Sequence, residues 1–79
     1  MGYTVISRTE CSWCDKAMDL LYEHGIDYEK VDIYDDPWVR TLLEKANLGT
    51  VPQVFNNTGV LIGGYEELCQ HINNIDIYQ

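Results

Sequence analysis

The spacing of apolar residues changes from that of a strand to that of a helix at Cys11, and this change constrains the fold more than any other feature. Residues Tyr3 to Ser7 are largely β-branched or aromatic, which predicts a buried strand. Beyond Cys11 the apolar positions recur every three or four residues, at Cys14, Ala17, Met18 and Leu21. This spacing predicts one face of a helix. Gly25 suits the left-handed position that follows a helix, so we expect the helix to end there.

The next stretch of the chain predicts a second strand and a second helix. Residues Tyr28 to Ile33 form the strand, whose alternation places Asp32 and Ile33 on opposite faces. Asp36 suits the N-cap of the helix and Pro37 suits its first position. The apolar stripe of this helix comprises Val39, Leu42, Leu43 and Ala46. We expect the helix to end within residues 47–49.

Two short strands and a third helix complete the chain. Gln53 to Phe55 and Val60 to Ile62 flank the sequence Asn-Asn-Thr-Gly, which is typical of a β-hairpin. From Tyr65 onward the apolar residues Leu68, Ile72 and Ile75 again follow helical spacing. The element order β-α-β-α-β-β-α predicts an α/β fold, with three helices on the two faces of a four-stranded mixed sheet.

Length and composition limit the chain to one small globular domain, residues 1–79, with 46% hydrophobic and 23% charged residues. Thirteen acidic and five basic residues give a net charge of −8, which repels nucleic acids and anionic membranes, so we expect neither as a partner. The sequence has no apolar run that could span a membrane, and its start does not resemble a signal peptide. We therefore expect a reducing compartment, the cytoplasm, or the host cytoplasm if a phage encodes the chain.

The motif Cys11-Ser12-Trp13-Cys14 lies where the first strand gives way to the first helix. Unpaired N–H groups and the helix dipole stabilise a thiolate at such a position, and Cys-x-x-Cys motifs favour reactive thiols. Arg8 adds a positive charge at the same end. Cys14 lies one turn into the helix, within reach of Cys11, and suits the role of a resolving thiol. The pattern predicts a redox-active pair.

A structural zinc site is the alternative, because Cys69 and His71 complete a set of three cysteines and one histidine. Cys69 and His71 are two residues apart in a predicted helix, however, so their side chains point in nearly opposite directions. We therefore predict no metal ligands. We expect Cys69 to be a half-buried packing residue, His24 and His71 to be solvated helix residues, and Trp38 to pack locally.

Two further segments allow a structural and a functional interpretation. Pro52, in Thr50-Val51-Pro52, suits the start of a strand, and it could also form a cis bond that presents the Val51 backbone to an extended peptide. The N–H groups that open the third helix, after Gly63-Gly64, could bind a carboxylate. Acidic residues in a first turn also simply favour the helix dipole.

Together these segments resemble a glutaredoxin, along essentially the whole chain. The matching motifs are T-V-I-x-R-x-x-C-x-x-C at residues 4–14, V-D-I at 31–33, T-V-P-Q-V-F at 50–55 and G-G-Y-x-x-L at 63–68. The resemblance implies a thioredoxin-like fold, and the short length is similar to that of bacterial or phage members. It also implies a dithiol oxidoreductase that uses glutathione as co-substrate and holds no cofactor tightly.

The resemblance assigns roles to individual residues. Cys11 would attack the disulfide or glutathionylated thiol, and Cys14 or glutathione would resolve the mixed disulfide. Arg8 would meet the glycine carboxylate of glutathione, Val51 would pair with its cysteine backbone, and Trp13 would flank the groove. The remaining expected glutathione-binding residues are Thr50, Pro52, Gly64, Tyr65, Glu66 and Glu67.

Two alternatives within this resemblance stay open. Ser12 and Trp13 replace the usual Pro-Tyr, and some glutaredoxins with serine there carry an iron–sulfur cluster between two protomers. A redoxin reduced by thioredoxin reductase is the other alternative, and the glutathione-binding pattern argues against it. We expect a monomer whose partners are disulfide-bonded or glutathionylated proteins, among which the family resemblance implies ribonucleotide reductase.

Overall fold

The computed structural model describes residues 2–77 and has the element order that the sequence predicts. The strands are β1 (Tyr3–Ser7), β2 (Tyr28–Asp32), β3 (Gln53–Phe55) and β4 (Leu61–Gly63). The helices are α1 (Ser12–Glu23), α2 (Pro37–Lys45) and α3 (Tyr65–Ile77). Among these helices, none combines the length and the apolar character that crossing a membrane requires.

The four strands form one mixed sheet in the order β2-β1-β3-β4. β1 runs parallel to β2 and antiparallel to β3, so that Val5 pairs with Lys30 on one side and with Val54 on the other. β3 and β4 form the predicted antiparallel hairpin. Because of these directions, β1 and β2 end and β3 begins at the same edge of the sheet. The loops that carry the candidate site residues therefore meet at this edge.

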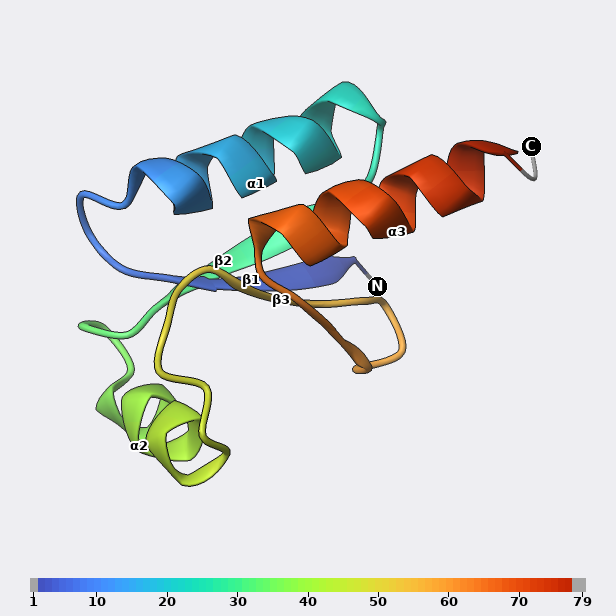
Figure 1. Cartoon of the computed structure of the whole chain (residues 1–79). Helices are drawn as coiled ribbons and strands as arrows, with labels where there is room; N and C mark the ends of the chain where they lie inside the picture. Colours follow the sequence, from blue (N-terminus) through green and yellow to red (C-terminus); the bar gives the residue numbers. More distant parts are fainter. Residues whose placement is uncertain (1, 78–79) are drawn as a thin grey trace.

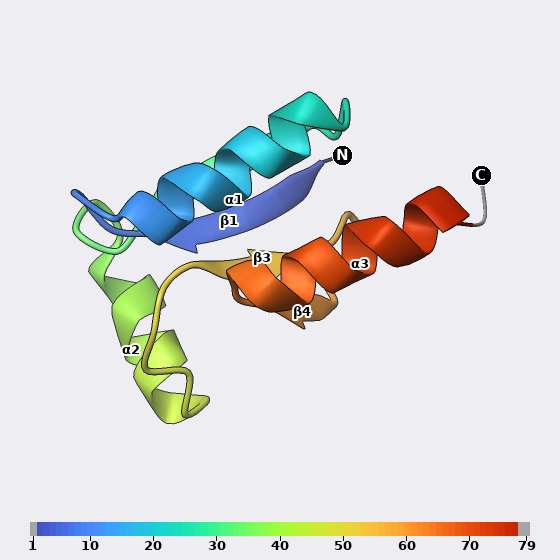
Figure 2. The same ribbon diagram turned by 45° about the horizontal axis from the view of Figure 1, so that its top comes forward.

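Helices α1 and α3 lie side by side on one face of the sheet, and α2 lies alone on the other face (Figures 1 and 2). The first face holds the larger core, which comprises Val5, Ala17, Leu21, Val54, Leu68 and Ile72. The face beneath α2 holds a smaller core of Ile6, Val39 and Leu43. Neighbouring residues of β1 point to opposite faces, so this strand contributes to both cores.

The ends of α1 follow from the residues at its two caps. Cys11 is the N-cap, with an extended backbone at φ −114° and ψ 103°, and its sulfur accepts a hydrogen bond from the Cys14 N–H. His24 is the C-cap, and Gly25 follows with φ +67°, the left-handed conformation that glycine adopts most readily. The helix thus begins at the reactive motif and ends where the sequence predicts.

The region of β2 and α2 differs from the sequence prediction in several places. β2 ends at Asp32 rather than Ile33, and it is Asp32 that is buried while Ile33 is half-buried. On α2, Val39 and Leu43 are buried as predicted, but Leu42 is 54% exposed and Ala46 is also exposed. Only Val39 and Leu43, one turn apart on the same side of this nine-residue helix, are buried, and the flanking apolar positions lie in solvent.

Three smaller predictions are also corrected. Asp36 occupies the N-cap of α2, but its side chain makes no capping hydrogen bond. Trp38 does not pack locally, because 66% of its surface is exposed. The strand β4 begins at Leu61 rather than Val60, and the Val60 carbonyl accepts a hydrogen bond from the Asn56 N–H within the hairpin.

Candidate functional site

Cys11 and Cys14 form a disulfide at the N-terminus of α1. Their Cα atoms are 5.2 Å apart, because one turn of helix separates them. Cys11 is 7% exposed and Cys14 is 1% exposed. The Cys14 N–H donates to the Cys11 sulfur at 3.2 Å. A backbone N–H at a helix start therefore points at the sulfur that would carry the negative charge of a thiolate, which is the arrangement that the sequence predicts.

The loop before Cys11 is held by Asp32, a buried carboxylate whose role the sequence did not indicate. Asp32 accepts a hydrogen bond from the Thr9 hydroxyl at 3.3 Å and another from the Tyr34 N–H at 2.8 Å. It thereby joins the β1–α1 loop to the β2–α2 loop. Glu10, next to the redox motif, has φ +58°, so the chain turns sharply just before Cys11. The hydrogen bond from Thr9 to Asp32 lies next to this turn.

A pocket of about 200 Å³ lies beside the redox motif. Its lining consists of Trp13, Thr50, Val51, Pro52, Gly64, Tyr65, Glu66 and Glu67. These are the residues that the family resemblance assigns to glutathione binding, with the exception of Arg8. They come from three separate segments, and the structure brings them to one place. The Val51–Pro52 peptide bond is cis, as the resemblance implies.

We call this space the redox pocket, and its rim carries an aromatic pair. The rings of Trp13 and Tyr65 are 5.5 Å apart and inclined by 47°, and the Lys16 ammonium lies 4.4 Å from the centre of the Trp13 ring. A hydrogen bond with the Cys69 thiol is the main cause that raises the pKa of Tyr65 above its usual value. Cys69 is half-buried, as predicted, and contacts the pocket through this tyrosine.

The N-terminus of α3 is already capped from within. The Gly64 N–H donates to Glu67 Oε1 at 2.8 Å, so a carboxylate occupies the position that a ligand carboxylate was expected to take. Gly63 has φ +127°, and a Cβ there would lie 2.8 Å from Glu67 Cγ. Glycine at this position therefore lets the Glu67 side chain fold back. A ligand that uses the Gly64 N–H has to displace the Glu67 carboxylate.

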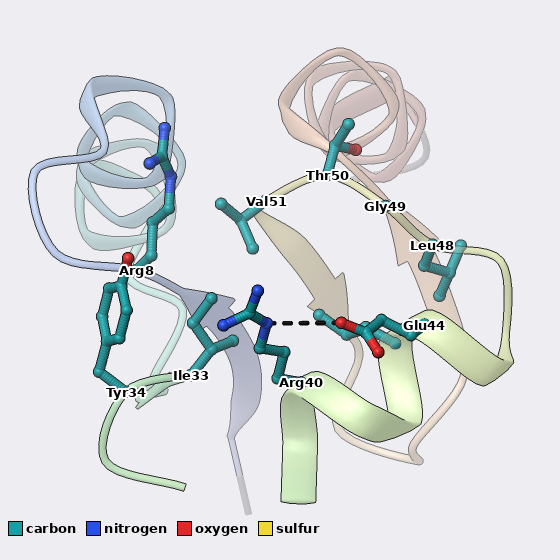
Figure 3. A pocket seen from close by; sticks show the side chains of 10 residues that line it. Arg8, Ile33, Tyr34, Arg40, Glu44, Leu48, Gly49, Thr50 and Val51 are labelled. Atoms are coloured by element: carbon teal, nitrogen blue, oxygen red, sulfur yellow. Dashed lines mark ion pairs between the residues drawn. The ribbon is translucent and has the colours of Figure 1, made fainter. Parts of the chain in front are cut away.

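Arg8 lies in a second pocket, of about 490 Å³, which shares Thr50 and Val51 with the redox pocket. We call it the arginine pocket. Figure 3 shows Arg8 on the wall next to α1 and Arg40 with its guanidinium in the middle of the pocket. Arg40 forms an ion pair with Glu44 at 3.4 Å. Sequence reasoning missed Arg40, although one signal was present: Arg8 and Arg40 are the only two arginines in the chain.

The prediction for His71 is tested halfway along α3. His71 is not a solvated residue: its ring is half-buried, and its Nε2 forms a hydrogen bond with the Tyr3 hydroxyl at 2.9 Å. It packs against the Tyr3 ring as well, at 5.9 Å between centroids. Within residues 2–77, the structure gathers no group of three or more cysteine, histidine and acidic side chains that could hold a metal ion.

Comparison with known proteins identifies the family. The glutaredoxin family model matches residues 3–61. The chain is 33% identical over 72 residues to the bifunctional monothiol glutaredoxin-S16, chloroplastic, of Arabidopsis thaliana, covering 86% of this chain and 24% of that protein. It is 31% identical over 64 residues to human mitochondrial glutaredoxin-2, covering 76% of this chain and 38% of that protein. The chain thus spans well under half the length of either relative.

The solved structure of a buckwheat glutaredoxin–glutathione complex matches the fold, with a TM-score of 0.78 and 26% identity, over 92% of this chain and 69% of that one. The four-stranded mixed sheet with three helices is a thioredoxin-like fold, and the disulfide-forming pair Cys11 and Cys14 lies at the start of α1. The chain belongs to the glutaredoxin family.

Proposed function

We propose that the protein is a glutathione-dependent reductase of protein disulfides and glutathionylated thiols. The observation that carries this proposal is the redox pocket: eight residues from three segments surround a space of about 200 Å³ that adjoins the Cys11–Cys14 motif through Trp13. All eight are positions that the family resemblance assigns to glutathione. The match to a glutaredoxin that was solved with glutathione supports the same ligand.

Glutathione would lie along the edge of the Val51 backbone, with its sulfur toward Cys11. Val51 precedes β3, so its N–H and C=O groups can pair with the cysteine residue of an extended tripeptide. The γ-glutamyl end would reach the start of α3, where helix N–H groups favour its carboxylate and Glu66 or Glu67 favours its ammonium group. The glycine carboxylate would reach the arginine pocket, where Arg8 lies.

The reaction begins with the reduced pair. The Cys11 thiolate attacks one sulfur of the substrate disulfide, a Cys11–substrate disulfide forms, and the other substrate sulfur leaves as a thiolate that takes a proton from water. The Cys14 thiolate then attacks the Cys11 sulfur, forms the Cys11–Cys14 disulfide and releases the second substrate thiol. When the substrate is a glutathionylated thiol, the mixed disulfide joins Cys11 to glutathione, and a second glutathione can instead attack its glutathione sulfur, which frees Cys11 and forms glutathione disulfide. Two molecules of glutathione reduce the Cys11–Cys14 disulfide and become glutathione disulfide. The two electrons that the substrate gains thus come from glutathione.

This proposal places the protein in a reducing compartment, the cytoplasm, where a glutathione pool is maintained. Its protein substrates would be disulfide-bonded or glutathionylated proteins. Ribonucleotide reductase is one substrate that the family resemblance implies.

The reductant is tested by supplying the protein with either of two recycling systems and a small disulfide substrate. We expect turnover with glutathione and glutathione reductase, measured as NADPH consumption, and little turnover with thioredoxin reductase. Turnover with thioredoxin reductase alone would overturn the proposal. An absorbance spectrum of the freshly purified protein in the presence of glutathione serves as a further check, because a brown, dimeric form would favour an iron–sulfur carrier.

The contribution of Arg8 is tested by Arg8→Glu, which replaces a partner of a carboxylate with a group that repels it. We expect a higher KM for glutathione, because the Arg8 side chain lines the arginine pocket where the glycine carboxylate would lie. Lys30→Glu is the matched control, since it makes the same change in charge on β2, outside both pockets. An equal KM in the two variants would remove Arg8 from the glutathione site.

A further inference from the structure

The arginine pocket is larger than the redox pocket and differs from it in chemistry. Its volume of about 490 Å³ is in the range of pockets that bind peptides and small molecules. Its walls include the apolar side chains of Ile33, Leu43, Leu48 and Val51, and its charged groups are two arginines and Glu44. The pocket therefore suits a ligand that combines an anionic group with apolar surface.

The charge of this pocket is opposite to that of the molecule. The chain has thirteen acidic and five basic residues, yet both of its arginines line this one space. Arginine binds carboxylates through a planar fork of donors, so two arginines at one pocket favour an anionic ligand. The Arg40–Glu44 ion pair does not prevent this, because the two side chains are 64% and 66% exposed. Exposed pairs are weak enough for another carboxylate to compete.

The arginine pocket is continuous with the site of the chemistry. Thr50 and Val51 line both pockets, so an extended peptide that pairs with the Val51 backbone in the redox pocket would enter the arginine pocket with its next residues. Glutathione has a single residue beyond its cysteine on the glycine side, whereas a protein substrate continues. Arg40, whose guanidinium lies in the middle of the pocket in Figure 3, is then available to a residue of the protein substrate.

We propose that the arginine pocket selects protein disulfides whose cysteine is flanked by an acidic residue, which Arg40 binds. The proposal rests on the proposed disulfide reductase function and names its protein substrates by their chemistry. The apolar walls would contact the aliphatic part of the acidic side chain and its neighbours. The net charge of −8 by itself attracts basic peptides, whereas the arginine pocket should favour acidic ones.

The test uses reduced protein and three symmetrical peptide disulfides, which differ in having Glu, Gln or Lys on both sides of the cysteine. The Cys11 thiolate attacks one peptide sulfur, Cys14 then attacks Cys11, and two peptide thiols leave, so the exchange needs no glutathione. The measured quantity is the rate of peptide thiol release at low ionic strength. We expect the Glu peptide to react roughly two- to fivefold faster than the Gln peptide, because an exposed ion pair contributes an energy of about that ratio. The Lys peptide should react most slowly.

Arg40→Gln should abolish the advantage of the Glu peptide, and Lys45→Gln is its matched control. Lys45 lies on the same helix and loses the same charge, but it does not line the pocket. If the Lys peptide reacts fastest with the wild-type protein, or if the two variants change the three rates alike, the pocket does not select acidic substrates. Peptide exchange with no turnover in the glutathione assay would instead contradict the glutathione dependence and leave the pocket's selectivity intact.

Discussion

At the scale of single residues, Cys11 and Cys14 have the same chemistry and different positions. Cys11 is the N-cap of α1 and accepts the Cys14 N–H, whereas Cys14 lies inside the first turn and is 1% exposed. A helix N-terminus stabilises negative charge, and Cys11, at 7% exposure, is less deeply buried than Cys14 and so easier for a substrate to reach. We therefore propose Cys11 as the attacking thiol and Cys14 as the thiol that resolves the mixed disulfide.

Serine variants of the two cysteines test this division of roles. We expect Cys11→Ser to abolish all thiol transfer. Cys14→Ser should retain turnover of a glutathionylated substrate, because external glutathione can resolve the mixed disulfide at Cys11, and it should lose reduction of a protein disulfide that needs a second thiol in the enzyme. The measurement is the activity of each variant on the two substrates. An active Cys11→Ser beside an inactive Cys14→Ser would reverse the roles.

The residues of the redox pocket could be predicted because the short motifs that carry the resemblance to glutaredoxins contain or adjoin them. The Cys-x-x-Cys motif marks a strand-to-helix junction, and Thr50-Val51-Pro52 precedes a strand. Arg40 and Asp32 could not be predicted in this way. Each acts through contacts with segments distant in the sequence, and an arginine on an amphipathic helix or an acid at a strand end has no local pattern that separates it from an ordinary surface residue.

At the scale of elements, the contact between β1 and α3 combines a hydrogen bond with the packing of two half-buried rings. The Tyr3 hydroxyl binds His71 Nε2 at 2.9 Å, across 68 residues of sequence. Burial raises the pKa of Tyr3 above its usual value, because it disfavours the ionised form. The folded protein therefore holds this proton more tightly than the unfolded chain does. This tighter binding of the Tyr3 proton adds to the free energy of unfolding. The contribution is fully present below about pH 10, and it is lost as the pH rises through the pKa of Tyr3 in the folded protein.

Tyr3→Phe tests this contact at two pH values. Near neutral pH we expect a loss of about 1 kcal/mol in the free energy of unfolding, from the missing hydrogen bond. Above pH of about 10 the difference should shrink, because the wild-type protein loses stability there and the variant has no hydroxyl at this position to ionise. Urea unfolding at each pH gives both quantities. Tyr22→Phe, at a tyrosine that is 79% exposed, should show neither effect.

The elements show where sequence patterns are sufficient and where packing decides. The order and type of all seven elements follow from hydrophobic periodicity and turn residues. Periodicity does not predict which apolar residues of α2 are buried, because Leu42 fits the periodic pattern and is nevertheless exposed to solvent. His71 shows the converse. Its helical spacing indicates a solvated residue, and only the fold brings Tyr3 against it.

At the scale of the whole molecule, two cores of unequal size share one sheet. The core under α1 and α3 has six buried residues, and the core under α2 has three. β1 joins them, because Val5 belongs to the first core and its neighbour Ile6 to the second. In a chain of 79 residues neither core is large enough to be stable alone, so the two should unfold together.

Truncation of one leucine in each core tests this coupling. Leu68 lies in the larger core and is 0% exposed. Leu68→Ala should lower the free energy of unfolding by roughly 2–5 kcal/mol, which is a large part of the stability of a small domain. Leu43→Ala should cost less, because Leu43 is 6% exposed and its core can relax toward solvent.

The free energies come from urea unfolding of the oxidised protein, followed by circular dichroism and by tryptophan fluorescence. Trp13 lies on α1 and Trp38 on α2, so fluorescence senses both faces of the sheet. Coincident single transitions in both variants are expected. A separate early transition in Leu43→Ala would mean that α2 unfolds independently, and with it the Arg40 wall of the arginine pocket.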